Sequence, residues 1–259
     1  MSQKLVISVS GKGGTGKTTL TALLLKWLIQ NTEEVALVVD ADPATNLPDV
    51  LGVELERTVG TVSKEMKDKI ERGTLPVTTP KQDLLEAWVF QTLVEEDRFD
   101  LIAMGRSEGE GCYCFVNNVL TRIMDTLTRN YSVTLLDMEA GLEHISRRTD
   151  RDMDVLLIVT DPSRMGFETA RRIKELAQEV HIEVKHIYLV GNQFSEEFEE
   201  TLQSAAKEIG LDLAGYLPVD PDIMKFNIMG KPLLEIPESS PAYRAVEEIA
   251  HKIGLDRLK

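Results

Sequence analysis

The stretch SGKGGTGKTT, residues 10–19, constrains the fold of this chain more than any other part of its 259-residue sequence. It follows the apolar run KLVISVS (4–10) and has the spacing of glycine, four residues, glycine, lysine and threonine that forms a P-loop. The backbone N–H groups of such a loop point at phosphate oxygens, and glycines are needed because side chains would block that approach. The sequence therefore predicts a strand, a phosphate-binding loop and a helix. The expected binding residues are Gly11, Lys12, Gly13, Gly14, Thr15, Gly16, Lys17, Thr18 and Thr19.

Two side chains of this loop match the chemistry of a nucleotide. Lys17 places a positive charge near the outer phosphates, and the Thr18 hydroxyl is a suitable ligand for Mg²⁺. The helix behind the loop begins at the phosphates, so the positive end of its dipole adds to the attraction for anions. The expected ligands are therefore the phosphates of a nucleotide together with Mg²⁺.

The rest of the chain alternates short apolar runs with helical patterns. The further runs expected to be strands are 35–40, 99–105, 132–137, 154–160, 184–192 and a weaker one at 213–220. Between the first two strands, apolar residues recur at the spacing of an amphipathic helix, namely Leu20, Leu23, Leu24, Trp27 and Leu28. This alternation predicts an α/β fold of the P-loop NTPase type, with a mostly parallel central sheet of about seven or eight strands and helices on both faces.

Domain organisation and charge narrow the possible partners. The chain is expected to form a single domain over residues 1–259, with a helical insertion at about 56–98. The net charge of −14 disfavours binding to nucleic acid or to an anionic membrane. The sequence contains no run of about 18 apolar residues and no N-terminal pattern typical of a leader peptide. The expectation is a cytoplasmic protein.

The only two cysteines, Cys112 and Cys114, lie in the stretch EGEGCYCFVNN (108–118). Side chains two residues apart in an extended segment point the same way, so the pair can present two sulfurs together. Two thiolates fill half of a soft-metal site, and a symmetric dimer would bring two such pairs together to bind one Ni²⁺ or Zn²⁺. Buried cysteines without a metal, or a strained disulfide, remain the alternatives.

Lys12 and two aspartate motifs give the chain a family resemblance. The forms KGGTGKT, VVDADP and LLDMEAG resemble the deviant Walker A ATPases of the MinD, ParA and nitrogenase-iron-protein type. The resemblance implies that Asp42 orients the attacking water and that Asp40 and Asp137 hold Mg²⁺ through its water shell. The implied nucleotide is then ATP or ADP, and the implied catalytic residues are Lys12, Lys17 and Asp42.

The same resemblance implies a homodimer and a site for the base. In this family the lysine at the position of Lys12 reaches the partner's phosphates, so ATP joins the subunits. The segments LVGNQ and YLPVD resemble those that hold adenine and ribose, which points to Asn192, Pro218 and Asp220.

The motif GCYC between the two aspartate motifs, with GLEHISR after the second, resembles the CooC family, including the AcsF proteins. That resemblance implies an ATP-hydrolysing homodimer, dependent on ATP, on metal or on both, that handles nickel. The client enzyme would be carbon monoxide dehydrogenase or acetyl-CoA synthase.

Two other functions remain open at the level of sequence. One is an ATP-dependent iron–sulfur reductase of the nitrogenase-iron-protein type, although that family uses two well-separated single cysteines per subunit. The other is a positioning ATPase like MinD or ParA. A MinD-like protein needs a basic amphipathic C-terminal helix, whereas residues 241–259 mix acids with bases and predict a packed terminal helix.

Overall fold

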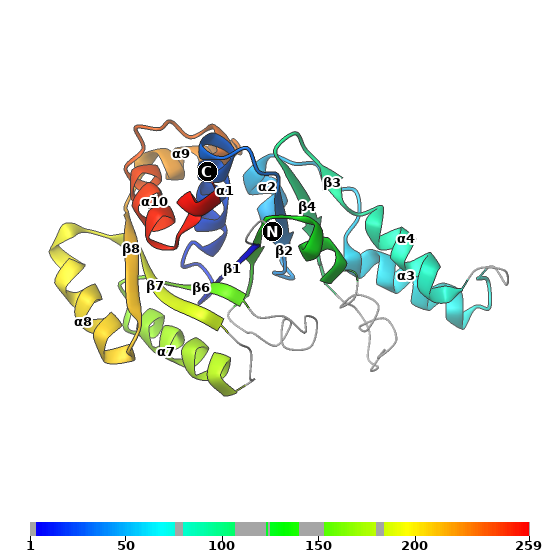
Figure 1. The fold of residues 1–259 in the computed structure, drawn as a ribbon, viewed down its shortest axis with the longest axis horizontal. Coiled ribbons are helices and arrows are strands. Elements are labelled where there is room, and N and C mark those ends of the chain that lie inside the picture. Colours follow the sequence, from blue (N-terminus) through cyan, green and yellow to red (C-terminus); the bar gives the residue numbers. More distant parts are fainter. Residues whose placement is uncertain are drawn as a thin grey trace.

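The computed structural model describes residues 4–75, 80–106, 123, 125–139, 153–179 and 184–258. These residues form an eight-stranded sheet in the order β3-β4-β2-β5-β1-β6-β7-β8 (Figure 1). The strands are β1 (Leu5–Gly11), β2 (Ala36–Asp40), β3 (Val94–Glu95), β4 (Phe99–Ala103), β5 (Val133–Asp137), β6 (Met153–Thr160), β7 (Val184–Phe194) and β8 (Asp212–Pro218).

All neighbouring strands of the sheet are parallel except β3, which is antiparallel to β4. Every apolar run that was predicted to be a strand is one, so the predicted α/β fold class is confirmed. The edge strand β3 was not predicted, because two residues are too short to show any periodicity. Parallel pairing brings the carboxyl ends of β1, β2, β5 and β6 to one edge of the sheet, where the polar loops gather.

Helices cover both faces of the sheet (Figure 1). One hydrophobic cluster joins the sheet to α1, α2 and α10, and the other joins it to α3, α4, α7 and α8. The helices are α1 (Lys17–Asn31), α2 (Leu47–Leu51), α3 (Val59–Glu71), α4 (Lys81–Phe90), α7 (Arg164–Glu179), α8 (Glu199–Ile209), α9 (Pro221–Met229) and α10 (Pro241–Lys252), with short 3₁₀ turns at Glu196–Phe198, Leu233–Glu235 and Leu255–Leu258.

Helix α1, which follows the phosphate loop, is more deeply buried than its sequence pattern predicts. The predicted apolar stripe is buried, and so are all the remaining residues from Leu20 to Leu28. The prediction of an amphipathic helix was therefore wrong for this part of α1, because α10 and the Leu233–Glu235 turn cover the side that faces away from the sheet. Even Lys26 is buried, and its Nζ donates a hydrogen bond to the Leu234 carbonyl at 2.7 Å. Burial on all sides holds the start of α1 firmly under the loop.

Two helices, α3 and α4, lie within residues 56–98. Helix α3 begins at a capping box, in which the side chains of Thr58 and Thr61 each accept a hydrogen bond from the other's backbone N–H. Both helices pack on the same face of the sheet as α7.

The last helix, α10, is packed into the core as the sequence predicted. Its buried residues are Ala242, Tyr243, Val246, Ile249 and Ala250. Across the described ranges, no helix combines the length and the apolarity that crossing a bilayer requires.

Candidate functional site

The phosphate loop connects the end of β1 to the start of α1, and its shape depends on glycine. Gly14 and Gly16 have φ angles of 82° and 89°, in the left-handed region that L side chains rarely adopt. A Cβ atom on Gly16 would also lie 2.1 Å from Nδ2 of Asn192. Glycine at position 16 is thus needed both for the backbone turn and for the close approach of β7.

Hydrogen bonds inside the loop hold its backbone in place. The Lys12 carbonyl accepts hydrogen bonds from the Thr15 amide at 3.2 Å and from the Thr15 hydroxyl at 2.8 Å. From outside the loop, Asn192 Nδ2 donates to the Thr15 carbonyl at 2.7 Å. Lys17 Nζ lies 3.5 Å from the Lys12 carbonyl, and Lys17 is only 6% exposed. These contacts fix the backbone of the loop and the position of Lys17.

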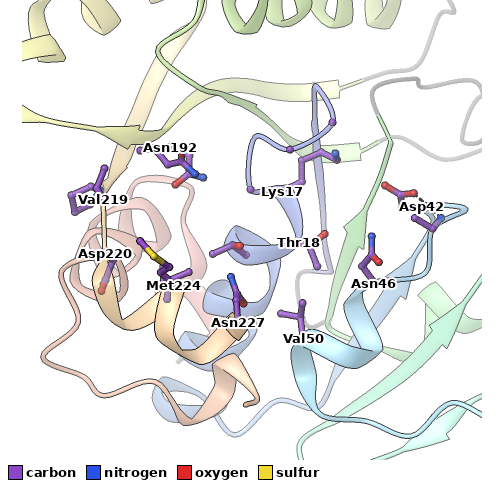
Figure 2. A pocket seen from close by; sticks show the side chains of 18 residues that line it. Lys17, Thr18, Asp42, Asn46, Val50, Asn192, Val219, Asp220, Met224 and Asn227 are labelled. Atoms are coloured by element: carbon purple, nitrogen blue, oxygen red, sulfur yellow. Dashed lines mark hydrogen bonds between the residues drawn. The ribbon is translucent and has the colours of Figure 1, made fainter. Parts of the chain in front are cut away.

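A pocket of about 730 Å³ opens beside this loop (Figure 2). Its phosphate side is lined by Gly13, Gly14, Gly16, Lys17, Thr18 and Thr19. Its far side is lined by Asn192, Gln193, Pro218, Val219, Asp220 and Met224. Asp42, Asn46, Val50 and Asn227 also line it (Figure 2). One pocket is therefore lined by six of the nine predicted phosphate-binding residues, by Asp42 and by all three residues predicted to hold adenine and ribose.

Two buried carboxylates stand next to each other at the end of the phosphate loop. Asp40 and Asp137 are register partners on the neighbouring strands β2 and β5, and they are 0% and 1% exposed. Thr18 Oγ1 donates a hydrogen bond to Asp137 Oδ2 at 2.6 Å. Asp40 accepts backbone N–H groups of Asp42 and Leu47 at 3.1 and 3.0 Å. Strand pairing brings Asp40 and Asp137 together, and the first turn of α1 adds Thr18, so the three residues predicted to hold Mg²⁺ lie at one place.

The electrostatics of this pair favour a cation. Burial raises the pKa of Asp137 to about 7, and the nearby Asp40 carboxylate adds to the rise. Burial likewise raises the pKa of Asp40 to about 6. Asp137 Oδ1 is buried, and no hydrogen bond from the described part of the chain reaches it. A buried acceptor without a donor, beside a threonine hydroxyl and a second carboxylate, fits Mg²⁺ and its water shell.

Asp42 lies in the loop after β2, at the side of the pocket. Its Oδ1 accepts the Ala44 amide at 2.9 Å, and its carbonyl accepts the Thr45 amide at 3.0 Å. Thr45 adopts a φ of 53°, which is unusual for a β-branched residue. These bonds form a tight turn that directs Asp42 toward the space beside Lys17 (Figure 2).

Asp220 also has a clear structural task. Its Oδ1 caps α9 by accepting the Asp222 amide at 2.8 Å. Its Oδ2 accepts the Ser240 hydroxyl at 2.5 Å and the Ala242 amide at 3.0 Å, at the start of α10. The sequence signal for this cap is the aspartate directly before proline in VDPD, which is typical of a helix start.

The structure adds site residues that the sequence analysis missed. Val219, Met224 and Asn227 line the pocket from the β8–α9 turn and from α9, although α9 carries no motif. Asp161, after β6, lies with its Oδ2 3.6 Å from Lys12 Nζ. No local pattern marks Asp161, because only the pairing of β6 with β1 brings it to the loop. Cys112 and Cys114 lie outside the described residues.

Comparisons with known proteins show the family to which this chain belongs. The ParA family model described as a NUBPL iron-transfer P-loop NTPase matches residues 1–254. An uncharacterized ATP-binding protein of Methanocaldococcus jannaschii is 49% identical over 249 residues, which cover 96% of this chain and 98% of that protein. The carbon monoxide dehydrogenase accessory protein CooC of Rhodospirillum rubrum is 32% identical over 249 residues, covering 92% and 91%.

Among solved structures, the fold resembles the septum site-determining protein MinD of Pyrococcus horikoshii complexed with Mg-ADP. The TM-score is 0.69 at 19% identity, over 98% of this chain and 99% of that one. A ParA family ATPase from Chlorobium tepidum matches with a TM-score of 0.70 at 19% identity, over 98% and 100%. The full-length sequence matches and the P-loop geometry together show that this chain is an ATP-binding P-loop NTPase of the ParA family.

Proposed function

We propose that this protein is a Mg²⁺-dependent ATPase that works as a homodimer and matures a nickel enzyme. The observation that carries the proposal of hydrolysis is the arrangement of Thr18, Asp137 and Asp40 beside Lys17. A cation held by these residues would lie next to the outer phosphates of a nucleotide bound in the loop.

Each residue of the site has a physical task in hydrolysis. The loop amides and the Lys17 ammonium bind phosphate oxygens and stabilise negative charge that develops on the γ-phosphoryl group. Thr18, Asp40 and Asp137 would hold Mg²⁺, which, when bound, neutralises charge on the β- and γ-phosphates. Asp42, fixed by its turn at the side of the pocket, would orient the attacking water.

The base side of the pocket is proposed to hold adenosine. Asn192, Pro218 and Asp220 line it, and Val219 and Met224 add an exposed apolar surface against which a base can stack. Since both carboxylate oxygens of Asp220 already accept hydrogen bonds, its support of the ribose is expected to come mainly from holding α9 in place.

The proposed homodimer follows from Lys12. The Lys12 side chain is 38% exposed, and its ammonium can reach a neighbouring molecule once it leaves the Asp161 carboxylate, 3.6 Å away. ATP would then join two subunits, each providing Lys12 to the phosphates of the other.

The nickel assignment is supported by two observations. The first is the 32% identity to the carbon monoxide dehydrogenase accessory protein CooC over nearly the whole chain. The second is the pair of thiols at Cys112 and Cys114, the only cysteines of the sequence. Two copies of the chain would supply four thiolates, a set that suits Ni²⁺ or Zn²⁺. The client would be carbon monoxide dehydrogenase or acetyl-CoA synthase.

Metal titration tests this assignment. We expect the purified dimer to bind one Ni²⁺ per two chains, measured by elemental analysis after gel filtration, and the variant Cys112→Ser/Cys114→Ser to lose that metal while keeping its ATP binding. Binding should weaken as the pH falls and should release protons, because thiolates must be deprotonated to bind. Equal nickel content in the double variant, or one metal per monomer without dimerisation, would disprove the shared thiolate site.

An iron–sulfur function is the second candidate, because the matching family model is described as an iron-transfer NTPase. Anaerobic purification distinguishes the nickel function from the iron–sulfur function. A brown protein whose iron and sulfide depend on Cys112 and Cys114 would support the second candidate, whereas a colourless protein that takes up nickel supports the first.

A further inference from the structure

The two lysines of the phosphate loop point in different directions. Lys17 lines the nucleotide pocket and is 6% exposed. The Lys12 side chain is 38% exposed, and its Nζ lies 3.6 Å from Oδ2 of Asp161, whose side chain is 24% exposed. Asp161 thus forms an ion pair with Lys12 within one subunit.

Strand pairing explains why Asp161 stands beside the loop. In the parallel register of β1 and β6, Gly11 pairs with Val159. Lys12 follows Gly11 directly, and Asp161 comes two residues after Val159, so both side chains leave the sheet at the same edge. Their proximity therefore comes from the pairing of two neighbouring strands inside the sheet.

Hydrogen bonds from Ser163 hold the Asp161 carboxylate in place independently of Lys12. Its Oδ1 accepts hydrogen bonds from the Ser163 amide at 3.1 Å and from the Ser163 hydroxyl. The Ser163 hydroxyl oxygen in turn accepts the Gly166 amide at 3.0 Å. A Cβ on Gly166 would lie 2.3 Å from Asp161 Oδ1, so the first turn of α7 approaches this carboxylate closely. One oxygen is committed to the turn, and the other faces Lys12.

Asp161 is therefore a fixed anion. Burial by itself would raise the pKa of Asp161, but the hydrogen bonds from Ser163 and the Lys12 ammonium together hold that pKa below its usual value. The Lys12 backbone is also held, because its carbonyl accepts both donors of Thr15. Only the long side chain of Lys12 is free to change direction.

We propose that Asp161 is a positioning residue that holds the Lys12 ammonium outside its own nucleotide pocket until the phosphates of a second copy of the chain replace the carboxylate. This role rests on the proposed ATP-dependent homodimer. It makes dimerisation a competition for Lys12 between a carboxylate in the same subunit and a triphosphate in the other. Asp161 thus influences the dimerisation equilibrium of subunits that have bound nucleotide.

The size of the effect follows from the exposure of the pair. A partly exposed ion pair of this kind contributes a factor of about two to five to an equilibrium. A triphosphate with several charges outcompetes a single carboxylate. Asp161 is therefore expected to tune dimerisation without preventing it.

The variant Asp161→Asn tests the proposal. An asparagine oxygen still accepts the Ser163 amide, so the turn is kept while the charge is removed. Sedimentation velocity with Mg²⁺ and a non-hydrolysable ATP analogue should show dimerisation about two- to fivefold tighter than in the parent. The difference should shrink at high salt, because screening already weakens a partly exposed ion pair.

Two controls separate this role from a general effect of charge. Glu200→Gln removes an equally negative, exposed side chain from α8 and should leave dimerisation unchanged. In a Lys12→Gln background, Asp161→Asn should have no effect on dimerisation. Tightening that persists without Lys12, or that Glu200→Gln reproduces, would overturn the proposal.

The ion pair between Lys12 and Asp161 can also be tested without dimerisation. In nucleotide-free protein, limited acetylation followed by peptide mass analysis should modify Lys12 about two- to fivefold faster in Asp161→Asn than in the parent. Equal rates would show that the pair does not form. A parent that stays monomeric with the analogue contradicts the proposed ATP-dependent dimer. A parent that dimerises no less tightly than Asp161→Asn contradicts only the role of Asp161.

Discussion

At the scale of single residues, the site combines groups whose burial is unfavourable without a ligand. Asp40 and Asp137 are almost completely buried next to each other, and Asp137 Oδ1 lacks a donor among the described residues. Placing two carboxylates in such a position costs free energy, which a cation at the same place would recover. The two buried carboxylates are therefore expected to be more stable when a cation is bound between them.

The buried carboxylates predict an unusual pH dependence of stability in the nucleotide-free, Mg²⁺-free protein. Between about pH 4 and pH 7, folded Asp137 keeps a proton that the unfolded chain has lost, because its pKa rises from 3.8 to about 7 on folding. The free energy of unfolding should therefore fall as the pH rises through this window, by about 4 kcal/mol at most.

Urea unfolding of the parent and of Asp137→Asn, in EDTA from pH 5 to pH 8, measures this contribution. The amide variant should be the more stable protein at pH 8 and should approach the parent at pH 5. Parallel curves for the two proteins would mean that Asp137 is already ionised in the folded state.

Variants of Lys17 and Asp42 are expected to show that the two residues act at different steps, Lys17 in ATP binding and Asp42 in ATP hydrolysis. Lys17→Ala removes charge from the phosphates and should abolish detectable ATP binding, measured by calorimetry. Asp42→Asn should bind ATP with nearly parental affinity but hydrolyse it at least tenfold more slowly, because this residue acts on water rather than on phosphate. Unchanged turnover in Asp42→Asn would remove Asp42 from the catalytic residues.

At the scale of elements, the base side of the pocket depends on how α9 is attached. Helix α9 has no buried residues of its own. Asp220 links it to Ser240 and Ala242 at the start of α10, which is firmly packed on the sheet. Ile223 and Phe226 of α9 also pack against the core, so the Asp220 carboxylate is one of the contacts that set the position of this side of the pocket.

Replacement of this carboxylate should destabilise the protein as well as weaken nucleotide binding. Asp220→Asn keeps the cap of α9, but its amide nitrogen cannot accept the hydrogen bonds from Ser240 and Ala242. Buried donors without acceptors should lower the free energy of unfolding by about 1–3 kcal/mol. Urea unfolding without nucleotide measures this loss. Asp222→Asn, whose cap contact is through the backbone only, is the matched control and should change stability little.

At the scale of the whole molecule, the pocket is built from segments that are distant in the sequence, so a nucleotide bound there would join them. The loop after β1, the turn after β2, and the ends of β7 and β8 all line it. Those segments come from both halves of the sheet on either side of β1 (Figure 1). Nucleotide binding should therefore stabilise the entire described fold against unfolding.

Thermal unfolding with and without ligand tests this coupling. At a hundredfold excess of MgATP over its Kd, ligand binding adds about 2.7 kcal/mol to the free energy of unfolding. The melting temperature of the parent should rise with MgATP and rise less with ATP in EDTA, because the buried carboxylates then lack their cation. Lys17→Ala serves as the control and should show no rise with either. If MgATP does not change the melting temperature of the parent, the assignment of this pocket as the nucleotide site is wrong.

The local features of this protein could be predicted from its sequence alone. The strand, the glycine loop and the start of α1 are contiguous, so spacing and periodicity predicted them, and the apolar runs predicted all strands except the two-residue β3. Only the tertiary structure decided which side chains meet. Thr18 bonds Asp137 across 119 residues, and Asn192 reaches Thr15 across 177. Asp161 meets Lys12 only because β6 pairs with β1. Local propensity acts over a few residues, whereas strand order and register, which place these groups at one edge of the sheet, result from burial of the whole core.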